Sequence, residues 1–354
     1  MPLTSPVRPR SAVRLAAVAA AATALVLTGC ASPAEPASDS SSSSGGFGDI
    51  SVQLSWIKNV EFAGEYVAAD AGYFDDAGFG SVDLVAGPGA AESLVASGST
   101  TLAVTDPISA APAIVNEGAP IKIIATTYQK NPFTILSLTD AADIQTPDDL
   151  VGKRIGVQAG NETLFNALLE VNGIDAADVT IVPVEYDPSV LINGDVDGFL
   201  AYVTNESIIV ESQGYEVTNL TYADNGLPFV TESIIASQET IDNEPDMLAG
   251  FLYSLIRGWK DALAEPEAAV DLTMDLYGAE LGLDADVQLK QHLEAGSLIE
   301  SEDTAANGLF TMTDELIEQN IAVIAETGTA ITADELFDFS ILKQVYADHP
   351  ELIG

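Results

Sequence analysis

The sequence predicts an α/β protein of two lobes with a mainly helical C-terminal region. Residues 50–56 alternate between apolar and polar side chains, which is the period-two pattern of a strand with one buried face. A polar loop follows at 57–61, and Phe62 and Tyr66 then stand at helical spacing before Gly72. A strand, a loop and a helix in this order open an α/β sheet, and 354 residues suit two domains better than one.

Further strand patterns alternate with helical patterns along the chain. We expect these strands at 81–86, 101–105, 121–125, 135–138, 152–157, 179–184, 200–202 and 232–236. Residues 126–133 are interpreted as a polar and aromatic loop that contains Tyr128. From residue 240 the pattern is mainly helical, and Trp259 continues an apolar face with four-residue spacing, which predicts a core position for it.

Ligands of such sheets usually bind at the carboxyl ends of the strands. This rule selects the loop 56–61, the helix-opening turn 158–161 and the strand end 202–206. Tyr128 is added because an aromatic side chain outside a periodic face is free to stack on a ligand. The candidate ligand-binding residues are Trp56, Asn59, Glu61, Tyr128, Gln158, Asn161, Tyr202, Asn205 and Glu206. Two alternatives stay open, since Asn161 could be only a helix cap and Glu206 only a first-turn residue.

The N-terminal segment has the pattern of a secretory leader. Residues 1–29 contain no acidic residue, and three arginines precede an apolar run at 15–27 that is too short to predict a permanent membrane span. The run ends in Leu-Thr-Gly-Cys, which resembles a lipobox and implies cleavage before Cys30 and acylation of its sulfur; an accidental cysteine is the alternative. Residues 30–48 are rich in Ser, Pro, Ala and Gly, and we expect a disordered tether there.

Composition excludes several classes of function. The chain has 54 acidic and 12 basic residues and a net charge of −42, so nucleic acid is not expected as a partner. This charge could attract cationic ligands, but a solvated acidic surface suited to salty surroundings is the favoured interpretation. His292 and His349 stand far apart and Cys30 is the only cysteine, so no metal site, cofactor, disulfide or catalytic triad is expected.

Three motifs near the start of the predicted body carry a resemblance to a known family. W-x-x-N at 56–59, A-G-x-Y-V-A at 63–68 and G-Y-F-x-x-A-G-F at 72–79 resemble the start of NMT1/THI5-like solute-binding proteins of ABC importers. T-P-x-D-L-x-G-K-x-I-G-V at 146–157 is similar to a pattern found widely among bacterial solute receptors. The NMT1/THI5-like group includes receptors for thiamine-precursor pyrimidines and riboflavin, with relatives that bind nitrate, sulfonates and taurine.

The resemblance implies a periplasmic-binding-protein-like fold of type II, with a ligand cleft between its lobes. Lobe one would comprise 49–133 and 234–354, and lobe two 134–233. The implied protein is a monomeric receptor outside the cell membrane, anchored to its outer face through Cys30. It would capture a small-molecule solute and deliver it to an ABC permease that is driven by an ATPase.

The expected ligand is a planar, amine-bearing heterocycle. Anions need strong donors, yet the only arginines beyond the leader are Arg154 and Arg257, which are predicted at a strand start and in a helix. The aromatic candidates could stack on a heterocycle while the amide and carboxylate candidates supply hydrogen bonds. A hydroxymethylpyrimidine-like thiamine precursor ranks first, riboflavin second and small anions third. A pyrimidine-synthesising enzyme of the THI5 type and a solute sensor are the alternative functions, and the enzyme is disfavoured because its Cys-rich motif is absent.

Overall fold

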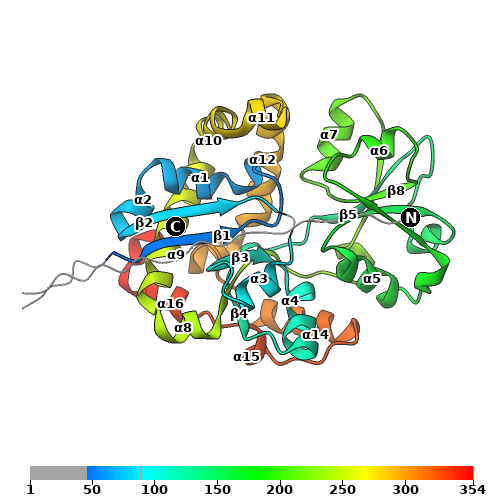
Figure 1. The fold of residues 1–354 in the computed structure, drawn as a ribbon. Coiled ribbons are helices and arrows are strands. Elements are labelled where there is room, and N and C mark those ends of the chain that lie inside the picture. Colours follow the sequence, from blue (N-terminus) through cyan, green and yellow to red (C-terminus); the bar gives the residue numbers. More distant parts are fainter. Residues whose placement is uncertain (1–45, 88, 354) are drawn as a thin grey trace, which may run out of the picture. The chain divides into compact units, whose positions relative to one another are not determined.

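Two mixed five-stranded sheets form the framework of the computed structural model, which describes residues 46–87 and 89–353 (Figure 1). The first sheet, in spatial order, contains β2 (Phe79–Val85), β1 (Gly48–Gln53), β3 (Leu102–Thr105), β10 (Thr231–Ser237) and β4 (Ile121–Tyr128). The second sheet, also in spatial order, contains β7 (Thr180–Val184), β6 (Arg154–Gln158), β8 (Gly198–Tyr202), β5 (Phe133–Leu138) and β9 (Val217–Thr221).

The two sheets share one topology. In the first, β10 is antiparallel to its neighbours β3 and β4, while β1 pairs in parallel with β2 and β3. In the second, β5 is antiparallel to β8 and β9, while β6 pairs in parallel with β7 and β8. Each sheet therefore has four strands in one direction and one returning strand in the same relative place, although the sequence shows no internal repeat.

Helices connect the strands and cover the sheets. Before β5 these are α1 (Ala63–Asp70), α2 (Tyr73–Ala77), α3 (Ala91–Ala96) and α4 (Pro107–Glu117). Between β5 and β10 they are α5 (Glu162–Val171), α6 (Ser189–Ile192) and α7 (Glu206–Ser212). Short 3₁₀ helices span Val60–Phe62, Pro147–Leu150, Ala176–Asp178, Ala223–Asn225 and Pro350–Leu352.

The chain after β10 is helical, as the sequence predicts. Its helices are α8 (Gln238–Asn243), α9 (Pro245–Ala264), α10 (Pro266–Thr273), α11 (Ala279–Leu281), α12 (Ala285–Ile299), α13 (Glu302–Asn307), α14 (Asp314–Glu326), α15 (Ala333–Leu336) and α16 (Ser340–Asp348), with a π-helical turn at Met274–Gly278. Helix α9 packs against α1 and α2, and α12 packs against both β4 and α7. Helix α12 therefore contacts a strand of the first sheet and the helix that follows β8 of the second sheet.

Two glycines allow α1 and α9 to cross closely. A Cβ atom on Gly64 would lie 2.2 Å from the indole of Trp259, and one on Gly258 would lie 2.2 Å from the carbonyl oxygen of Gly64. Neither position has room for a side chain, so the helix backbones can approach each other. Trp259 is buried in this contact, and it belongs to the main hydrophobic core together with residues of both sheets.

The predicted two-lobed α/β fold is confirmed, with differences at several elements. Tyr128 was expected in a loop but is the last residue of β4, because β10 continues the pairing as far as Thr231. Strand β9 was not predicted. Strand β1 spans Gly48–Gln53 where a strand at 50–56 was expected, so it begins at the last residue of the predicted tether and ends before Trp56. The leader and Cys30 lie outside the described residues. The predicted residue ranges of the lobes stay a prediction. The chain passes from the first sheet to the second between β4 and β5, and it returns to the first between β9 and β10.

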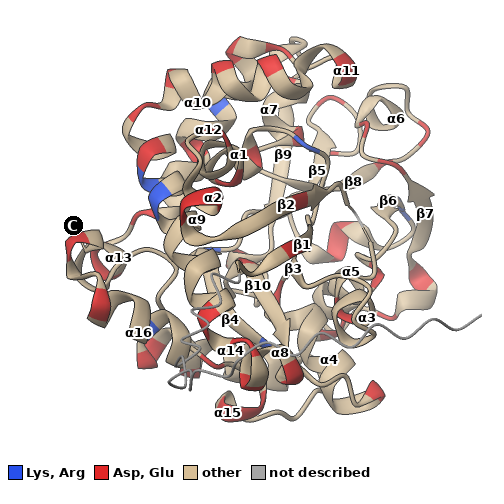
Figure 2. Ribbon diagram, turned by 60° about the vertical axis from the view of Figure 1, so that its left-hand side comes forward, with Lys and Arg blue, Asp and Glu red and all other residues tan. Residues whose placement is uncertain are grey.

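Acidic side chains are spread over the helices of the body, and basic ones are few (Figure 2). Among residues 46–87 and 89–353, no helix combines the length and the apolar character that crossing a membrane requires.

Candidate functional site

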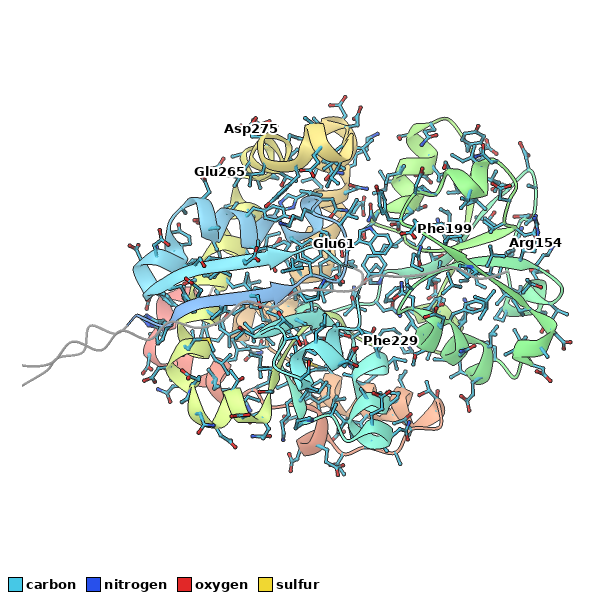
Figure 3. The ribbon with its side chains drawn as sticks, in the orientation of Figure 1. Glu61, Arg154, Phe199, Phe229, Glu265 and Asp275 are labelled. Atoms are coloured by element: carbon cyan, nitrogen blue, oxygen red, sulfur yellow. The ribbon has the colours of Figure 1, made fainter. Side chains whose placement is uncertain are left out.

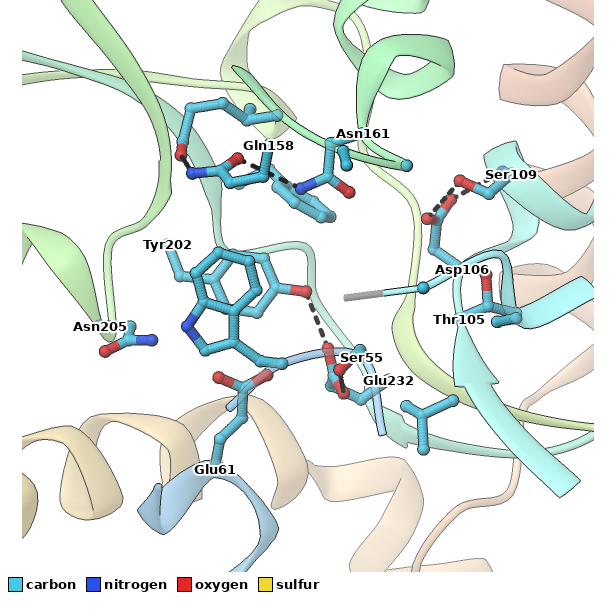
Figure 4. A pocket seen from close by; sticks show the side chains of 18 of the residues that line it. Ser55, Glu61, Thr105, Asp106, Ser109, Gln158, Asn161, Tyr202, Asn205 and Glu232 are labelled. Atoms are coloured by element: carbon cyan, nitrogen blue, oxygen red, sulfur yellow. Dashed lines mark hydrogen bonds between the residues drawn. The ribbon is translucent and has the colours of Figure 1, made fainter. Parts of the chain in front are cut away.

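A cavity lies where the two sheets meet, with about 710 Å³ of unfilled space that is partly open to solvent (Figure 4). Its walls come largely from the carboxyl ends of β1, β2, β3, β6 and β8 and the segments that follow them, which is the strand-end position expected for an α/β site. The antiparallel strands β5 and β10 contribute their first residues instead, because their amino ends meet the carboxyl ends of their neighbours. Both sheets therefore supply the site.

Carboxylates dominate the polar lining of the cavity. The acidic residues that line it are Glu61, Glu92, Asp106, Glu206 and Glu232, and the described lining includes no Lys, Arg or His. Side-chain carboxylates accept hydrogen bonds, and without a nearby cation they favour a ligand that donates them. The lining therefore suits a positively charged ligand or one rich in N–H groups.

Glu232 holds the central position among these carboxylates. Its Oε2 accepts a 2.8 Å hydrogen bond from the hydroxyl of Ser55, and its Oε1 accepts one of 2.8 Å from the phenol of Tyr202 (Figure 4). The backbone of Glu232 has a φ of 50°, an unusual conformation for a residue with a side chain. Such strained residues concentrate at ligand sites, where the surrounding structure holds them in place.

Burial changes the acidity of the whole group. It raises the pKa of Glu206 and of Glu232 to about 7 and the pKa of Asp106 to about 6. Burial, followed by the charge of Glu232, raises the pKa of Glu61 well above its ordinary value. Glu206 and Glu232 are therefore only partly ionised near neutral pH, and a ligand that donates hydrogen bonds favours their ionised forms.

Aromatic side chains form the apolar part of the cavity. Trp56, Phe133 and Tyr202 all line it, and the rings of Phe133 and Tyr202 meet edge to face with centroids 4.5 Å apart. This contact fixes the ring of Tyr202 in the wall. A planar ligand could lie against these rings while its edge faces the carboxylates.

All predicted binding residues except Asn59 and Tyr128 line this cavity. Asn59 and Tyr128 line a smaller adjoining pocket, in which they are joined by Glu61 and Asn205 of the main cavity. The side chain of Asn59 accepts a hydrogen bond from the backbone N–H of Glu61 and so caps the short helix there. Asn59 therefore has a structural partner, and whether any of these residues binds a ligand stays a prediction.

The polar side chains from the second sheet are held by hydrogen bonds. Gln158 donates to the carbonyl oxygen of Leu200 at 2.8 Å, and Asn161 donates to Oε1 of Gln158 at 3.3 Å. The side chain of Asn161 makes no capping hydrogen bond to helix α5, so a capping role does not account for it. Glu206 accepts the backbone N–H of Tyr202 at 2.9 Å.

Sequence reasoning missed Ser55, Glu232 and Phe133 as site residues and gave Asp106 no binding role. Asp106 is the N-cap of α4 and accepts hydrogen bonds from the backbone N–H groups of Ile108 and Ser109, and it also lines the cavity. Glu232 had one usable signal, since it interrupts an apolar segment at 229–236 and a carboxylate in such a segment is costly to bury.

The arginines of the body are engaged away from the cavity. Arg154 forms an ion pair with Asp197 at 2.8 Å and lies on the side of the second sheet remote from Glu61 (Figure 3). Arg257 stacks on the ring of Tyr73 with 3.6 Å to the centroid. Over the described part of the chain, no group of three or more His, Cys, Asp or Glu residues is arranged to hold a metal ion.

Comparison with known proteins identifies relatives by sequence. The family model described as NMT1/THI5 like matches residues 59–269. The riboflavin-binding protein RibY of Chloroflexus aurantiacus is 27% identical over 270 residues, which cover 73% of this chain and 75% of that protein. The formylaminopyrimidine-binding protein of Halalkalibacterium halodurans is 24% identical over 235 residues, 64% of this chain and 69% of that protein.

Solved structures show the same fold at lower identity. The alkanesulfonate-binding protein SsuA of Xanthomonas axonopodis pv. citri superposes with a TM-score of 0.60 at 14% identity, over 80% of this chain and 95% of that one. The desulfurization enzyme DszB superposes with a TM-score of 0.53 at 14% identity, over 85% of this chain and 99% of that one. At this identity the likeness concerns the fold alone, which binding proteins and an enzyme share.

Proposed function

This chain belongs to the NMT1/THI5-like family, and on that premise we propose that it is the extracytoplasmic receptor of an ABC importer for a small heterocycle rich in N–H donors. The preferred ligand is a thiamine-precursor pyrimidine of the hydroxymethylpyrimidine type or a close relative. Riboflavin is the second candidate.

The cavity lining is the observation that carries this proposal. Five carboxylates line a cavity whose described walls contain no cationic side chain, and aromatic rings supply its apolar face. An aminopyrimidine offers N–H groups along the edge of a flat ring, so its edge can meet carboxylates while its face lies on an aromatic side chain. The pKa of Glu206 and of Glu232, raised to about 7, makes both groups responsive to such donors.

The relatives support the same two ligands. The names of the two sequence relatives specify riboflavin and formylaminopyrimidine, both of which are planar nitrogen heterocycles. The carboxylate-rich lining favours the pyrimidine, because its exocyclic nitrogens supply more N–H donors than the single ring N–H of a flavin.

Small anions are disfavoured although SsuA shares the fold. A sulfonate or nitrate needs cationic or N–H donors, and the carboxylates of this cavity would repel it. Arg154 and Arg257 are engaged elsewhere and cannot supply the charge without rearrangement of the body.

The receptor role also includes several expectations that stay proposals. We expect binding without turnover, a monomer in solution, and docking to a permease with its ATPase. We also expect attachment to the outer face of the membrane through Cys30, which mass spectrometry of the membrane fraction can detect as a diacylated or triacylated N-terminal cysteine.

Thermal shift of the purified protein against a ligand panel tests the proposal. The panel contains formylaminopyrimidine, hydroxymethylpyrimidine, riboflavin, nitrate and an alkanesulfonate. A ligand that binds only the folded state stabilises it by about 2.7 kcal/mol at a hundred times its Kd, which is readily measured. We expect stabilisation by a pyrimidine or by riboflavin; stabilisation by an anion alone, or by none of the panel, contradicts the proposed ligand class.

A further inference from the structure

A relay of buried side-chain amides runs from the loop after β1 to the cavity. The backbone N–H of Val60 donates to Oε1 of Gln288 at 2.9 Å, and Nε2 of Gln288 donates to Oε1 of Gln291 at 2.6 Å. Nε2 of Gln291 then donates to Oδ1 of Asn205 at 2.7 Å. The side chains of Gln288, Gln291 and Asn205 are buried, with residue exposures of only 2%, 3% and 5%.

Two backbone groups fix the direction of this relay. The N–H of Val60 can only donate, so the oxygen of the Gln288 amide must face it and the nitrogen must face Gln291. At the other end, Nε2 of Gln291 also reaches the backbone oxygen of Asn205 at 3.2 Å, and a carbonyl oxygen can only accept. Both ends therefore require the same orientation of the two glutamine amides.

This orientation determines what Asn205 presents to the cavity. Its Oδ1 is used by Gln291, so its Nδ2 is the group left over, and Figure 4 shows the nitrogen turned toward the cavity and the oxygen turned away. Within the described chain, Nδ2 has no hydrogen-bond partner. If the amide were reversed, two N–H groups would face each other in a buried place, which burial penalises.

We propose that Gln288 and Gln291 are positioning residues that hold Asn205 as a hydrogen-bond donor, so that the cavity selects a heterocycle bearing a carbonyl oxygen beside its N–H groups. The inference rests on the proposed receptor function and narrows its ligand class: among thiamine-precursor pyrimidines it favours a carbonyl-bearing relative over hydroxymethylpyrimidine itself. A donor that no described residue engages, placed among carboxylates, favours an acceptor atom at that position of the ligand. Formylaminopyrimidine and riboflavin, the ligands in the names of the two relatives, both carry a carbonyl, whereas hydroxymethylpyrimidine does not.

Two variants separate the donor from the residues that orient it. Asn205→Asp keeps the oxygen that Gln291 contacts and replaces the donor by an acceptor of nearly the same shape. Gln291→Met keeps the volume of the side chain and removes the hydrogen bonds that orient Asn205. Gln344→Met serves as the matched control, because Gln344 is an exposed glutamine on α16.

Calorimetry with a pair of probes gives the decisive ratio. The probes are formylaminopyrimidine and the same aminopyrimidine without its formyl group. They differ by the carbonyl and by the basicity of the nitrogen that carries it, so each probe is compared with itself between variant and wild type. We expect Asn205→Asp to weaken binding of the formyl probe at least thirtyfold and Gln291→Met at least fivefold, with binding of the deformylated probe unchanged or tighter. Equal losses for both probes, or no loss, would overturn the inference.

Amide hydrogen exchange tests the relay without any ligand. Exchange of the Val60 N–H should be at least tenfold faster in Gln288→Met than in the wild type, and unchanged in Gln344→Met. Unchanged exchange in Gln288→Met would show that the relay does not form. Wild-type protein that binds neither probe and does not bind riboflavin would contradict the proposed function, and the carbonyl preference with it. A wild type that binds both probes, with variants that do not discriminate between them, would contradict only the inference.

Discussion

The phenol of Tyr202, at the end of β8, donates a 2.8 Å hydrogen bond to Oε1 of Glu232, at the start of β10. This bond joins the second sheet to the first at the wall of the cavity. Because Ser55 occupies the other carboxylate oxygen, Glu232 is held by a donor from each sheet and still has lone pairs for a ligand. The carboxylate that joins the sheets is therefore also one that the proposed ligand could contact.

Removal of this phenol should weaken binding. Tyr202→Phe deletes the hydrogen bond to Glu232 and keeps the ring, so we expect the Kd of the cognate heterocycle to rise by about 5- to 100-fold, corresponding to about 1–3 kcal/mol for a hydrogen bond to a charged group. Calorimetry measures the change. Tyr222→Phe is the matched control, because the buried phenol of Tyr222 has no partner among the described residues, and it should leave the Kd unchanged.

Replacement of Glu206 by Gln should also weaken binding. The carboxylate accepts the N–H of Tyr202, and we expect it to accept a charge-assisted hydrogen bond from the ligand as well. Loss of that charge should cost about 1–3 kcal/mol of binding free energy, as measured by calorimetry. Glu211→Gln, on the exposed face of the same helix, is the control. An unchanged affinity in Glu206→Gln would remove Glu206 from the binding site.

The free energy of unfolding should fall as pH rises from about 4.5 to 8. Burial raises the pKa of Glu65 to about 8, so the folded protein binds this proton more tightly than the unfolded chain does. The stabilisation is complete below the unfolded pKa and is lost as pH rises through the folded one. Glu65→Gln should therefore reduce the difference in unfolding free energy between pH 5 and pH 8 by roughly 2–4 kcal/mol. Urea denaturation at both pH values measures this difference in unfolding free energy. An equal pH dependence in wild type and variant would refute the raised pKa of Glu65.

The crossing of α1 and α9 should not tolerate a methyl group. Gly64→Ala places a Cβ where the indole of Trp259 lies, so we expect a loss of about 1–3 kcal/mol in unfolding free energy from overpacking. Chemical denaturation measures the loss. Ala69→Ser, on the exposed part of α1, should change stability by less than about 0.5 kcal/mol. A Gly64→Ala protein as stable as the wild type would mean that the two helices do not approach so closely.

The strand-end rule located much of the cavity because most strands of each sheet run in one direction. Trp56, Gln158 and Asn205 lie at or just after the carboxyl ends of β1, β6 and β8, so alternation and turn residues sufficed to place them there. Glu232 and Phe133 could not be found in this way. They begin antiparallel strands, and strand direction depends on pairing between distant segments that the local pattern does not contain.

Tyr128 illustrates the same limit at the level of one residue. Its neighbours Thr127 and Gln129 are polar, which favoured a loop, but pairing with Thr231 extends β4 and buries the ring. The relay from Val60 to Asn205 is a further case. Gln288 and Gln291 stand three residues apart on a helix, an ordinary spacing, and only packing of that helix between the two sheets gives them a joint role.

The most direct test of the account is calorimetric titration of the purified protein at pH 7.5 with formylaminopyrimidine, riboflavin and an alkanesulfonate. The carboxylate-lined cavity predicts saturable binding of at least one heterocycle and no binding of the sulfonate. Tight binding of the sulfonate with no response to either heterocycle would contradict the central claim that this cavity selects ligands that donate hydrogen bonds.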